Sequence, residues 1–150
     1  MRYVLDTNVL LYYVRDAATR QFLERRYQPF SDENDAIVSV ASVAEIQVLA
    51  AKYQWGRSKR SILQQLIDDV IVVEINSQTL IDTYVDTALY SLNIHPDYPR
   101  QGSAIKMGKN DLWIAATTRL TEATLLTSDG DFDHLIDGAL VKVEKYVQQK

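Results

Sequence analysis

Short runs of apolar, largely β-branched residues alternate with longer segments of helical periodicity along the whole chain. Five runs have the composition of strands: RYVLD (2–6), AIVSV (36–40), VIVVEI (70–75), TLLTS (124–128) and LVKVEKY (140–146). The segments with helical spacing lie at 19–27, 42–54, 58–69, 77–92, 110–122 and 131–137. Because parallel strands are joined by helical crossovers, this alternation predicts an α/β fold. We expect a three-layer α/β/α sandwich with a mostly parallel central sheet of about five strands.

Length and composition predict one compact domain over residues 1–150. The chain is 47% hydrophobic and contains no cysteine, which excludes a disulfide framework and a thiolate zinc site and is compatible with the cytoplasm. The apolar run 3–14 is interrupted by Asp6 and Asn8, is too short to span a bilayer and lacks the layout of a signal peptide. It reads as a buried strand running into a loop or helix. We therefore expect a cytoplasmic protein with no membrane association.

Four acidic residues from distant parts of the chain fall at predicted element junctions. Asp6 closes the first strand candidate, and Glu45 lies one turn into the helical segment after the second. Asp111 opens the helical segment before the fourth strand candidate, and Asp129 directly follows that strand. Because sites in open parallel sheets lie at the carboxyl ends of the strands, we expect these carboxylates to converge at one edge.

Each of these acids also has a local structural interpretation. Asp6 can cap the segment that follows it, and Ser42 with Glu45 has the spacing of a capping box. Asp111 follows Asn110, a good N-cap, and an acid in a first helical turn is favoured by the helix dipole. These interpretations are independent of one another and would not place every acid at the same sheet edge. The shared location therefore favours a functional site.

The acidic turn SDGDFD, at 128–133, has the composition of both a surface turn and a metal-binding loop. Asp129, Asp131 and Asp133 alternate around Gly130, a pattern that is common in surface turns without any function. The spacing also resembles the start of a calcium-binding EF-hand loop, but such a loop ends in Glu at its twelfth position, where this chain has Leu140. Calcium binding by such a loop is therefore excluded.

Converging carboxylates repel one another, which raises their pKa values or requires a cation. A site made only of oxygen ligands suits Mg²⁺ or Mn²⁺, which commonly also contact substrate phosphates. A water activated by the metal is then a natural nucleophile for in-line hydrolysis of a phosphodiester bond. The formal net charge of -4 argues against general affinity for nucleic acid, but an acidic metal site explains part of it.

Four stretches resemble PIN-domain ribonucleases, and specifically the VapC-type toxins of bacterial toxin–antitoxin pairs: LDTNVL (5–10), Ala44-Glu45, NDLWIAAT (110–117) and LLTSDGDF (125–132). They occur in the family's order and span almost the whole chain. The resemblance implies a PIN-like fold, an Mg²⁺- or Mn²⁺-dependent endoribonuclease and a cognate antitoxin protein as partner. The implied catalytic metal ligands are Asp6, Glu45, Asp111 and Asp129, with Asp131 as an auxiliary acid and Thr7, Asn8 and Thr127 as orienting groups.

Two basic segments are candidates for RNA binding. The stretch 93–109 is long and lacks periodicity, and its Arg100, Lys106 and Lys109 outnumber Asp97; it is either an RNA-binding loop or a mobile surface loop. KYQWGRSKR (52–60), which includes Arg57, interleaves cations with aromatic residues and could hold RNA or simply connect two helices in solvent. Helical faces such as 80–92 could support a homodimer, although core packing explains them equally well.

Other α/β proteins with acids at strand ends require residues that this chain lacks. A phospho-acceptor receiver requires an Asp after the middle strand, where this chain has Asn76 and Ser77. An Asp-nucleophile phosphatase requires an acid two positions after Asp6, where Asn8 stands, and the five glycines form no phosphate-binding loop. The remaining alternative is a PIN-like module that binds RNA or protein without cutting.

Overall fold

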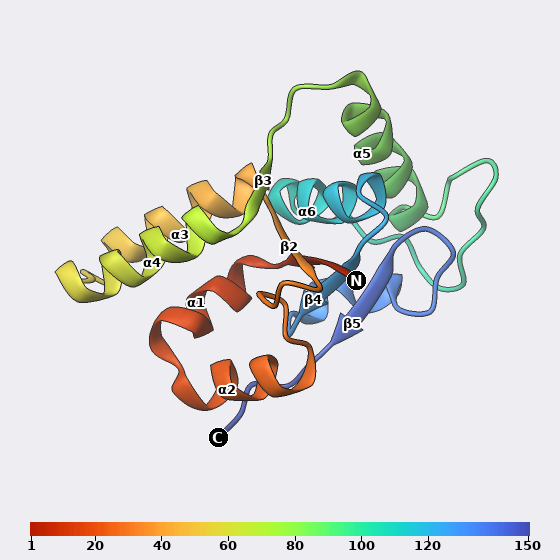
Figure 1. The fold of residues 1–150 in the computed structure, drawn as a ribbon. Coiled ribbons are helices and arrows are strands. Elements are labelled where there is room, and N and C mark those ends of the chain that lie inside the picture. Colours follow the sequence, from red (N-terminus) through yellow and green to blue (C-terminus); the bar gives the residue numbers. More distant parts are fainter.

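The computed structural model describes all residues from 1 to 150, and a single parallel sheet of five strands lies at its centre (Figure 1). The strands are β1 (Arg2–Leu5), β2 (Asp35–Ser39), β3 (Ile71–Val73), β4 (Thr124–Thr127) and β5 (Lys142–Lys145). Their order across the sheet is β3-β2-β1-β4-β5, and every neighbouring pair is parallel. Each of the apolar runs identified in the sequence thus forms a strand, and the predicted fold class is confirmed.

Seven helical segments connect the strands. They are α1 (Thr7–Arg15), α2 (Ala17–Arg26), α3 (Val40–Lys52), α4 (Arg57–Asp69), α5 (Gln78–Ser91), α6 (Lys109–Leu120) and the short 3-10 helix η1 (Gly130–Leu135). The apolar run 3–14 divides at Asp6 into a strand and a helix, as expected. The stretch between α5 and α6 contains no helix or strand, which confirms the long loop predicted there.

The sheet separates two hydrophobic cores, because alternate residues of a strand point to opposite faces. Tyr3 and Leu5 of β1 pack in one core with α1, α2, α3 and α4, whereas Val4 packs in the other with α5, α6 and η1. Figure 1 shows these two groups of helices on opposite sides of the strands. This arrangement is the predicted α/β/α sandwich.

The order of the strands also determines where a site can form. From the central β1 the chain builds one half of the sheet outward through β2 and β3, and the other half through β4 and β5. The direction of winding therefore changes between β1 and β4. Open α/β sheets carry ligand sites at the carboxyl ends of the strands beside such a change. In this chain Asp6 follows β1 and Asp129 lies just beyond β4, so they flank this position.

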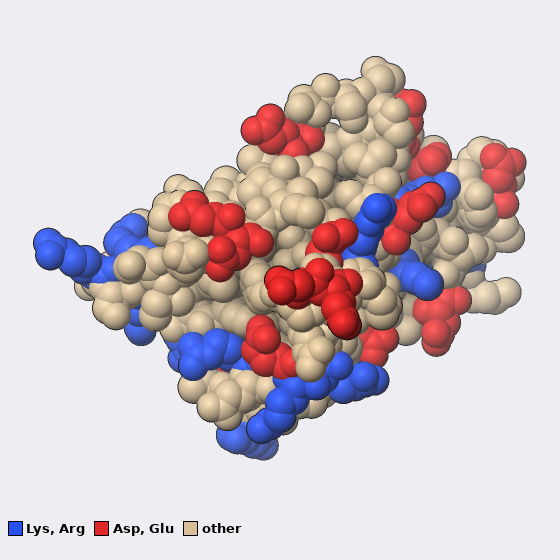
Figure 2. All heavy atoms as spheres, viewed as in Figure 1, with Lys and Arg blue, Asp and Glu red and all other residues tan.

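The helices α3 and α4 form a hairpin that projects from the sheet, and basic side chains gather at its outer tip (Figures 1 and 2). The segment KYQWGRSKR makes this tip, but Trp55 within it is only 6% exposed and belongs to the hydrophobic core. Trp55 therefore offers no stacking surface to RNA bases, although the segment could have held RNA through its aromatic residues. Tyr53 remains exposed, with the Arg15 guanidinium 4.8 Å from the centre of its ring.

No helix in the structure combines the length and the apolar character needed to cross a membrane.

We expect Trp55→Ala to lower the free energy of unfolding by about 3 kcal/mol, because it removes a large buried side chain from the core. Thermal melts check this, since 1 kcal/mol shifts the midpoint of a chain of this size by about 2–4 °C. Tyr53→Ala is the matched control, two positions away on the surface, and should cost about 1 kcal/mol or less. Equal destabilisation by the two substitutions would contradict the burial of Trp55.

Candidate metal centre

Asp6 lies at the end of β1 and begins α1. Its side chain is only 4% exposed, and its backbone N–H donates to the carbonyl of Leu126 in β4 at 3.1 Å. The carboxylate accepts hydrogen bonds from the Thr7 backbone N–H and from the Thr127 hydroxyl, each at 2.7 Å. Asp6 therefore caps α1, and it also points into the edge of the sheet between β1 and β4. The capping and functional interpretations of this residue are compatible.

Thr127 connects Asp6 with the acidic turn after β4. Its fully buried hydroxyl donates to Asp6 Oδ2 and accepts from the backbone N–H of Asp129 at 2.9 Å. One side chain thus sets the position of one acid and the backbone of another. Thr127 is expected to orient the site, and these are the two hydrogen bonds that such a role requires. Asn8 makes no side-chain hydrogen bond, and the buried Thr7 hydroxyl has no partner within the chain.

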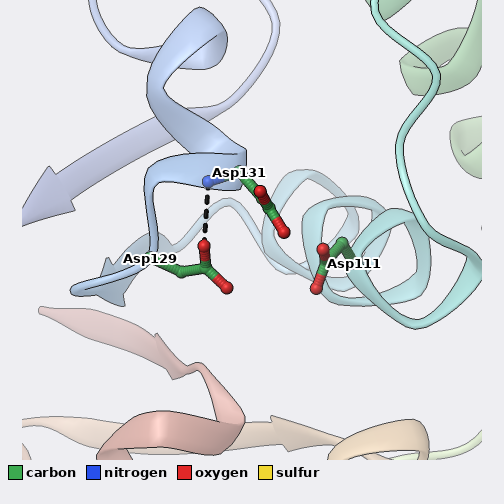
Figure 3. A group of neighbouring side chains, drawn as sticks. All are labelled: Asp111, Asp129 and Asp131. Atoms are coloured by element: carbon green, nitrogen blue, oxygen red, sulfur yellow. Dashed lines mark hydrogen bonds between the residues drawn. The ribbon is translucent and has the colours of Figure 1, made fainter.

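Asp111, Asp129 and Asp131 gather at this edge (Figure 3). One carboxylate oxygen from each lies within 4.8 Å of the others, and Figure 3 shows the three side chains directed into a common space. Asp111 comes from the first turn of α6, whereas Asp129 and Asp131 come from the turn after β4. The Asp131 backbone N–H donates to Asp129 Oδ1 at 2.9 Å, which fixes the turn. Asp131, expected only as an auxiliary acid, is therefore a full member of the group.

Glu45 and Asp6 lie outside this group but next to it. Glu45 extends from α3, and its Oε2 accepts a hydrogen bond from the Asn110 side-chain amide of α6 at 2.9 Å. Its charge, like that of Asp129, raises the pKa of Asp6. Asn110 was considered only as a helix cap from the sequence. Its position next to Asp111 within the motif NDLWIAAT was the signal that could have identified it as a site residue.

The capping box expected at Ser42 and Glu45 and the N-cap expected at Asn110 are wrong, whereas Asp111 does lie in the first turn of α6, where the helix dipole favours an acid. The strand β2 continues to Ser39, whose hydroxyl accepts from the Ala41 N–H, so α3 begins at Val40 and no capping box forms over 42–45. The helix α6 is capped by Gly108, two residues earlier than expected, and Asn110 lies inside the helix. Neither acid is therefore required to cap its own helix.

Burial and mutual repulsion make this edge electrostatically strained in the absence of a cation. Burial raises the pKa of Asp6 to about 6, against the opposing hydrogen bonds from Thr127 and Thr7. Burial also raises the pKa of Asp111 to about 7, with further increases from the charges of Asp6, Asp129 and Asp131. Clusters with strongly perturbed pKa values are characteristic of functional sites.

The donors of this cluster fit a hard divalent cation. They are all carboxylate oxygens, and no histidine or cysteine belongs to the group. Mg²⁺ and Mn²⁺ prefer such ligands and are usually held by a few carboxylates, with their remaining positions open to water or phosphate. Asp111, Asp129 and Asp131 would hold the ion, and the neighbouring Asp6 and Glu45 would add negative charge around it.

The four cations expected to bind RNA lie in different settings. Lys106 and Lys109 are exposed on the approach to Asp111 and make no ion pair. The Arg100 guanidinium instead donates to the carbonyls of Tyr90, Ser91, Gln101 and Ser103, so it orders the loop, and its contact with RNA stays a prediction. Arg57 begins α4 at the hairpin tip, about 18 Å along α3 from the carboxyl end of β2.

We expect the pH dependence of stability to reveal the strain at Asp111. Its folded pKa of about 7 exceeds its ordinary value of 3.8, so the folded protein binds this proton more tightly than the unfolded chain does. The free energy of unfolding of the metal-free protein should therefore fall as the pH rises through this interval. Asp111→Asn removes the effect, and in EDTA at pH 8 it should stabilise by about 2 kcal/mol, allowing for solvent screening of this half-buried group.

Thermal melts at pH 5 and pH 8, with EDTA or with Mn²⁺, measure this effect. The gain from Asp111→Asn should be small at pH 5, and Mn²⁺ should raise the wild-type midpoint at pH 8 more than that of the variant. The exposed, distant Asp82→Asn serves as the control. A variant that is less stable than the wild type at pH 8 in EDTA would show that Asp111 is structural.

Comparison with solved structures shows the same fold in several toxin–antitoxin complexes. A structure of VapBC2 from Rickettsia felis bound to a fragment of promoter DNA has a TM-score of 0.71 and 21% identity, covering 97% of this chain and 98% of that one. VapBC-1 from nontypeable Haemophilus influenzae has a TM-score of 0.67 and 23% identity, covering 97% of this chain and 98% of that one. VapBC-5 from Mycobacterium tuberculosis has a TM-score of 0.61 and 21% identity, with the same coverage of 97% and 98%. No curated protein matches the chain significantly.

The family model of the PIN domain matches residues 3–137, an interval that contains every acid described above. The resemblance drawn from the sequence motifs is therefore confirmed at the level of the family. Together with the sheet order and the solved structures of the same fold, this match shows that the chain belongs to the PIN domain family.

Proposed function

We propose that this protein is an Mg²⁺- or Mn²⁺-dependent endoribonuclease and the toxin of a toxin–antitoxin pair. The observation that carries the proposal is the convergence of Asp111, Asp129 and Asp131 beside Asp6, at the edge of the sheet where the winding changes direction. PIN domains are generally nucleases, and the acids expected at the site are all present. A catalytically inactive RNA- or protein-binding module is the alternative, and the complete set of acids disfavours it.

Different acids of the site have different proposed roles, in metal binding and in proton transfer. Asp111, Asp129 and Asp131 provide the ligand oxygens, and a divalent ion bound there would supply the positive charge that activates water and neutralises a phosphodiester. Asp6 is held by Thr7 and Thr127 with its charge directed at the same space, where it can accept a proton from the attacking water. Its pKa of about 6 suits proton transfer near neutral pH.

Glu45 closes the site from the side of α3. The Asn110 amide holds one of its oxygens, which leaves the other free to orient water or to contact a second ion. Because Asn110 and Asp111 are adjacent on α6, the two helices α3 and α6 are linked directly beside the ligand group. Rigid elements therefore position all five acids, as catalysis by orientation requires.

RNA is the proposed substrate, and Lys106 and Lys109 are the proposed phosphate contacts beside the cluster. Both are exposed, uncommitted cations next to the start of α6. Arg57 lies at the hairpin tip, so a contact from it would require RNA that extends well beyond the scissile bond. Phosphate contacts of this kind supply affinity without reading the sequence.

An antitoxin protein is the proposed partner, and a homodimer and a cytoplasmic location remain predictions. The structures with this fold include VapBC complexes from Rickettsia felis and Salmonella typhimurium that are bound to DNA. The projecting α3–α4 hairpin carries the exposed apolar side chains of Val48 and Ile62, and α5 carries those of Ile81 and Val85. These faces are available for protein contacts. A small antitoxin reading frame next to the gene is the expected genomic context, and its absence would argue for a solitary ribonuclease.

We expect Asp129→Asn to abolish Mn²⁺-dependent cleavage of structured RNA while the fold survives. Thr127→Val, which preserves shape but removes the hydroxyl that joins Asp6 to the Asp129 backbone, should lower kcat by about 10–100-fold. Gel assays of labelled RNA, with and without EDTA, measure both effects.

Thr124→Val is the matched control at the opposite end of β4 and should retain wild-type activity. Circular dichroism would establish that each variant is folded. Undiminished cleavage by Asp129→Asn would rule out the proposed role of that acid. Tight RNA binding by the wild type without cleavage of any RNA would favour the non-cutting module.

A further inference from the structure

A pocket of about 350 Å³ lies directly beside the acid cluster. Its first wall is the segment Ile105–Gly108, which leads into α6, and its second wall is formed by Gly130, Asp131, Asp133 and His134 of η1. Its volume lies at the lower end of the about 300–1,000 Å³ typical of pockets for small organic molecules. It could therefore accept one nucleoside but not a base pair within a duplex.

The pocket is continuous with the candidate metal centre at two points. Asp131 belongs both to the group of candidate ligands and to the pocket wall. On the other wall, a Cβ added at Gly108 would lie only 3.8 Å from Asp111 Oδ2, so the wall contacts a second candidate ligand. A phosphodiester placed at the acid cluster would therefore have its adjoining nucleotide at the mouth of this pocket.

The two walls are joined behind the pocket by Ser91, the last residue of α5. Its hydroxyl, which is 1% exposed, donates to Met107 Sδ at 3.1 Å and lies 2.8 Å from His134 Nε2. The backbone carbonyl of Ser91 accepts from the Ile105 N–H at 2.8 Å, and the same carbonyl accepts from the Arg100 guanidinium. These hydrogen bonds set the separation of the two walls. The shape of the pocket is therefore held by specific contacts.

The groups at the pocket suit a nucleotide. Lys106 is an exposed cation without an ion-pair partner, whereas Asp133 is already paired with Lys145 at 2.8 Å. His134 contributes an aromatic ring whose position is fixed by Ser91. Unpaired bases stack on aromatic and histidine rings, and lysines hold the adjoining phosphates. The pocket therefore combines a stacking group with a phosphate-binding group, one on each wall.

We propose that this pocket holds a single unpaired nucleotide next to the scissile phosphate, with its base against the His134 ring and its phosphate against Lys106. This inference rests on the proposed ribonuclease function and adds a restriction on the substrate. The nucleotide beside the cleavage site must be single-stranded, because a paired base cannot enter. Ser91 is a positioning residue that sets the width of the pocket through Met107 and His134.

Binding to short RNA, measured separately from cleavage, tests this proposal. In the Asp111→Asn background, which prevents turnover, fluorescence anisotropy gives the Kd of a labelled single-stranded RNA and of a duplex of the same sequence. His134→Ala and Lys106→Gln should each weaken binding of the single strand by about five-fold or more, because each removes one contact with the nucleotide. Binding of the duplex should change by less than about two-fold in His134→Ala, since a paired base cannot stack on the ring, and Lys106→Gln should weaken the single strand more than the duplex.

Lys142→Gln is the matched control for charge. Lys142 is an exposed lysine at the start of β5, the end of the sheet away from the acid cluster, and its substitution should leave both Kd values within about two-fold. Because Lys106 is exposed, Lys106→Gln tests the proposal even if His134→Ala fails to fold. A 2-aminopurine base placed beside the cleavage site should be quenched on binding, and His134→Ala should abolish the quenching.

The results separate this inference from the proposed function. Cleavage of RNA by the wild type, combined with Kd values for His134→Ala and Lys106→Gln equal to that of Lys142→Gln, would overturn the pocket but not the ribonuclease. Selective loss of single-strand binding without cleavage of any RNA by the wild type would support the pocket and overturn the ribonuclease. Ser91→Ala should raise KM more than it lowers kcat, whereas a purely structural role would lower thermal stability without that split.

Discussion

Negative charge is concentrated at one edge of the sheet, between β1 and β4, and the fold must hold it there against repulsion. Burial and like charges raise the pKa values of Asp6 and Asp111, so the free protein carries an electrostatic cost there that a cation would relieve. Thr127 is central to this arrangement, because its hydroxyl ties the carboxylate of Asp6 to the backbone of Asp129. A buried hydroxyl that satisfies two partners holds repelling groups in place without adding charge.

The sheet makes this convergence possible. Parallel strands deliver their carboxyl ends to the same edge, and the winding changes direction there between β1 and β4, which is where open α/β sheets carry their sites. The helices α3 and α6 then bring Glu45 and Asp111 from either side and are joined by the Asn110 amide. Each acid therefore lies within a helix or directly at the end of one, and the long loop between α5 and α6 contributes none of them.

The long connection between α5 and α6 is ordered by its own polar contacts. Arg100 donates to four backbone carbonyls, and the ring of His95 accepts hydrogen bonds from the N–H groups of Asp97 and Tyr98. A segment that looks featureless in the sequence thus becomes a fixed wall beside the acid cluster. Its cations consequently have different roles, since Arg100 supports the wall while Lys106 faces solvent at the pocket.

The strands, the class of the fold and the candidate acids can all be read from the sequence, because apolar periodicity and motif spacing are local properties of the chain. Tertiary structure decided what depends on distant segments meeting. It placed Asp131 rather than Glu45 in the three-carboxylate group, buried Trp55 in the core and turned Arg100 toward backbone carbonyls. It also brought Ser91 between Met107 and His134, residues 16 and 43 positions away. No local pattern encodes such contacts, because they arise only when the packed helices fix which side chains face one another.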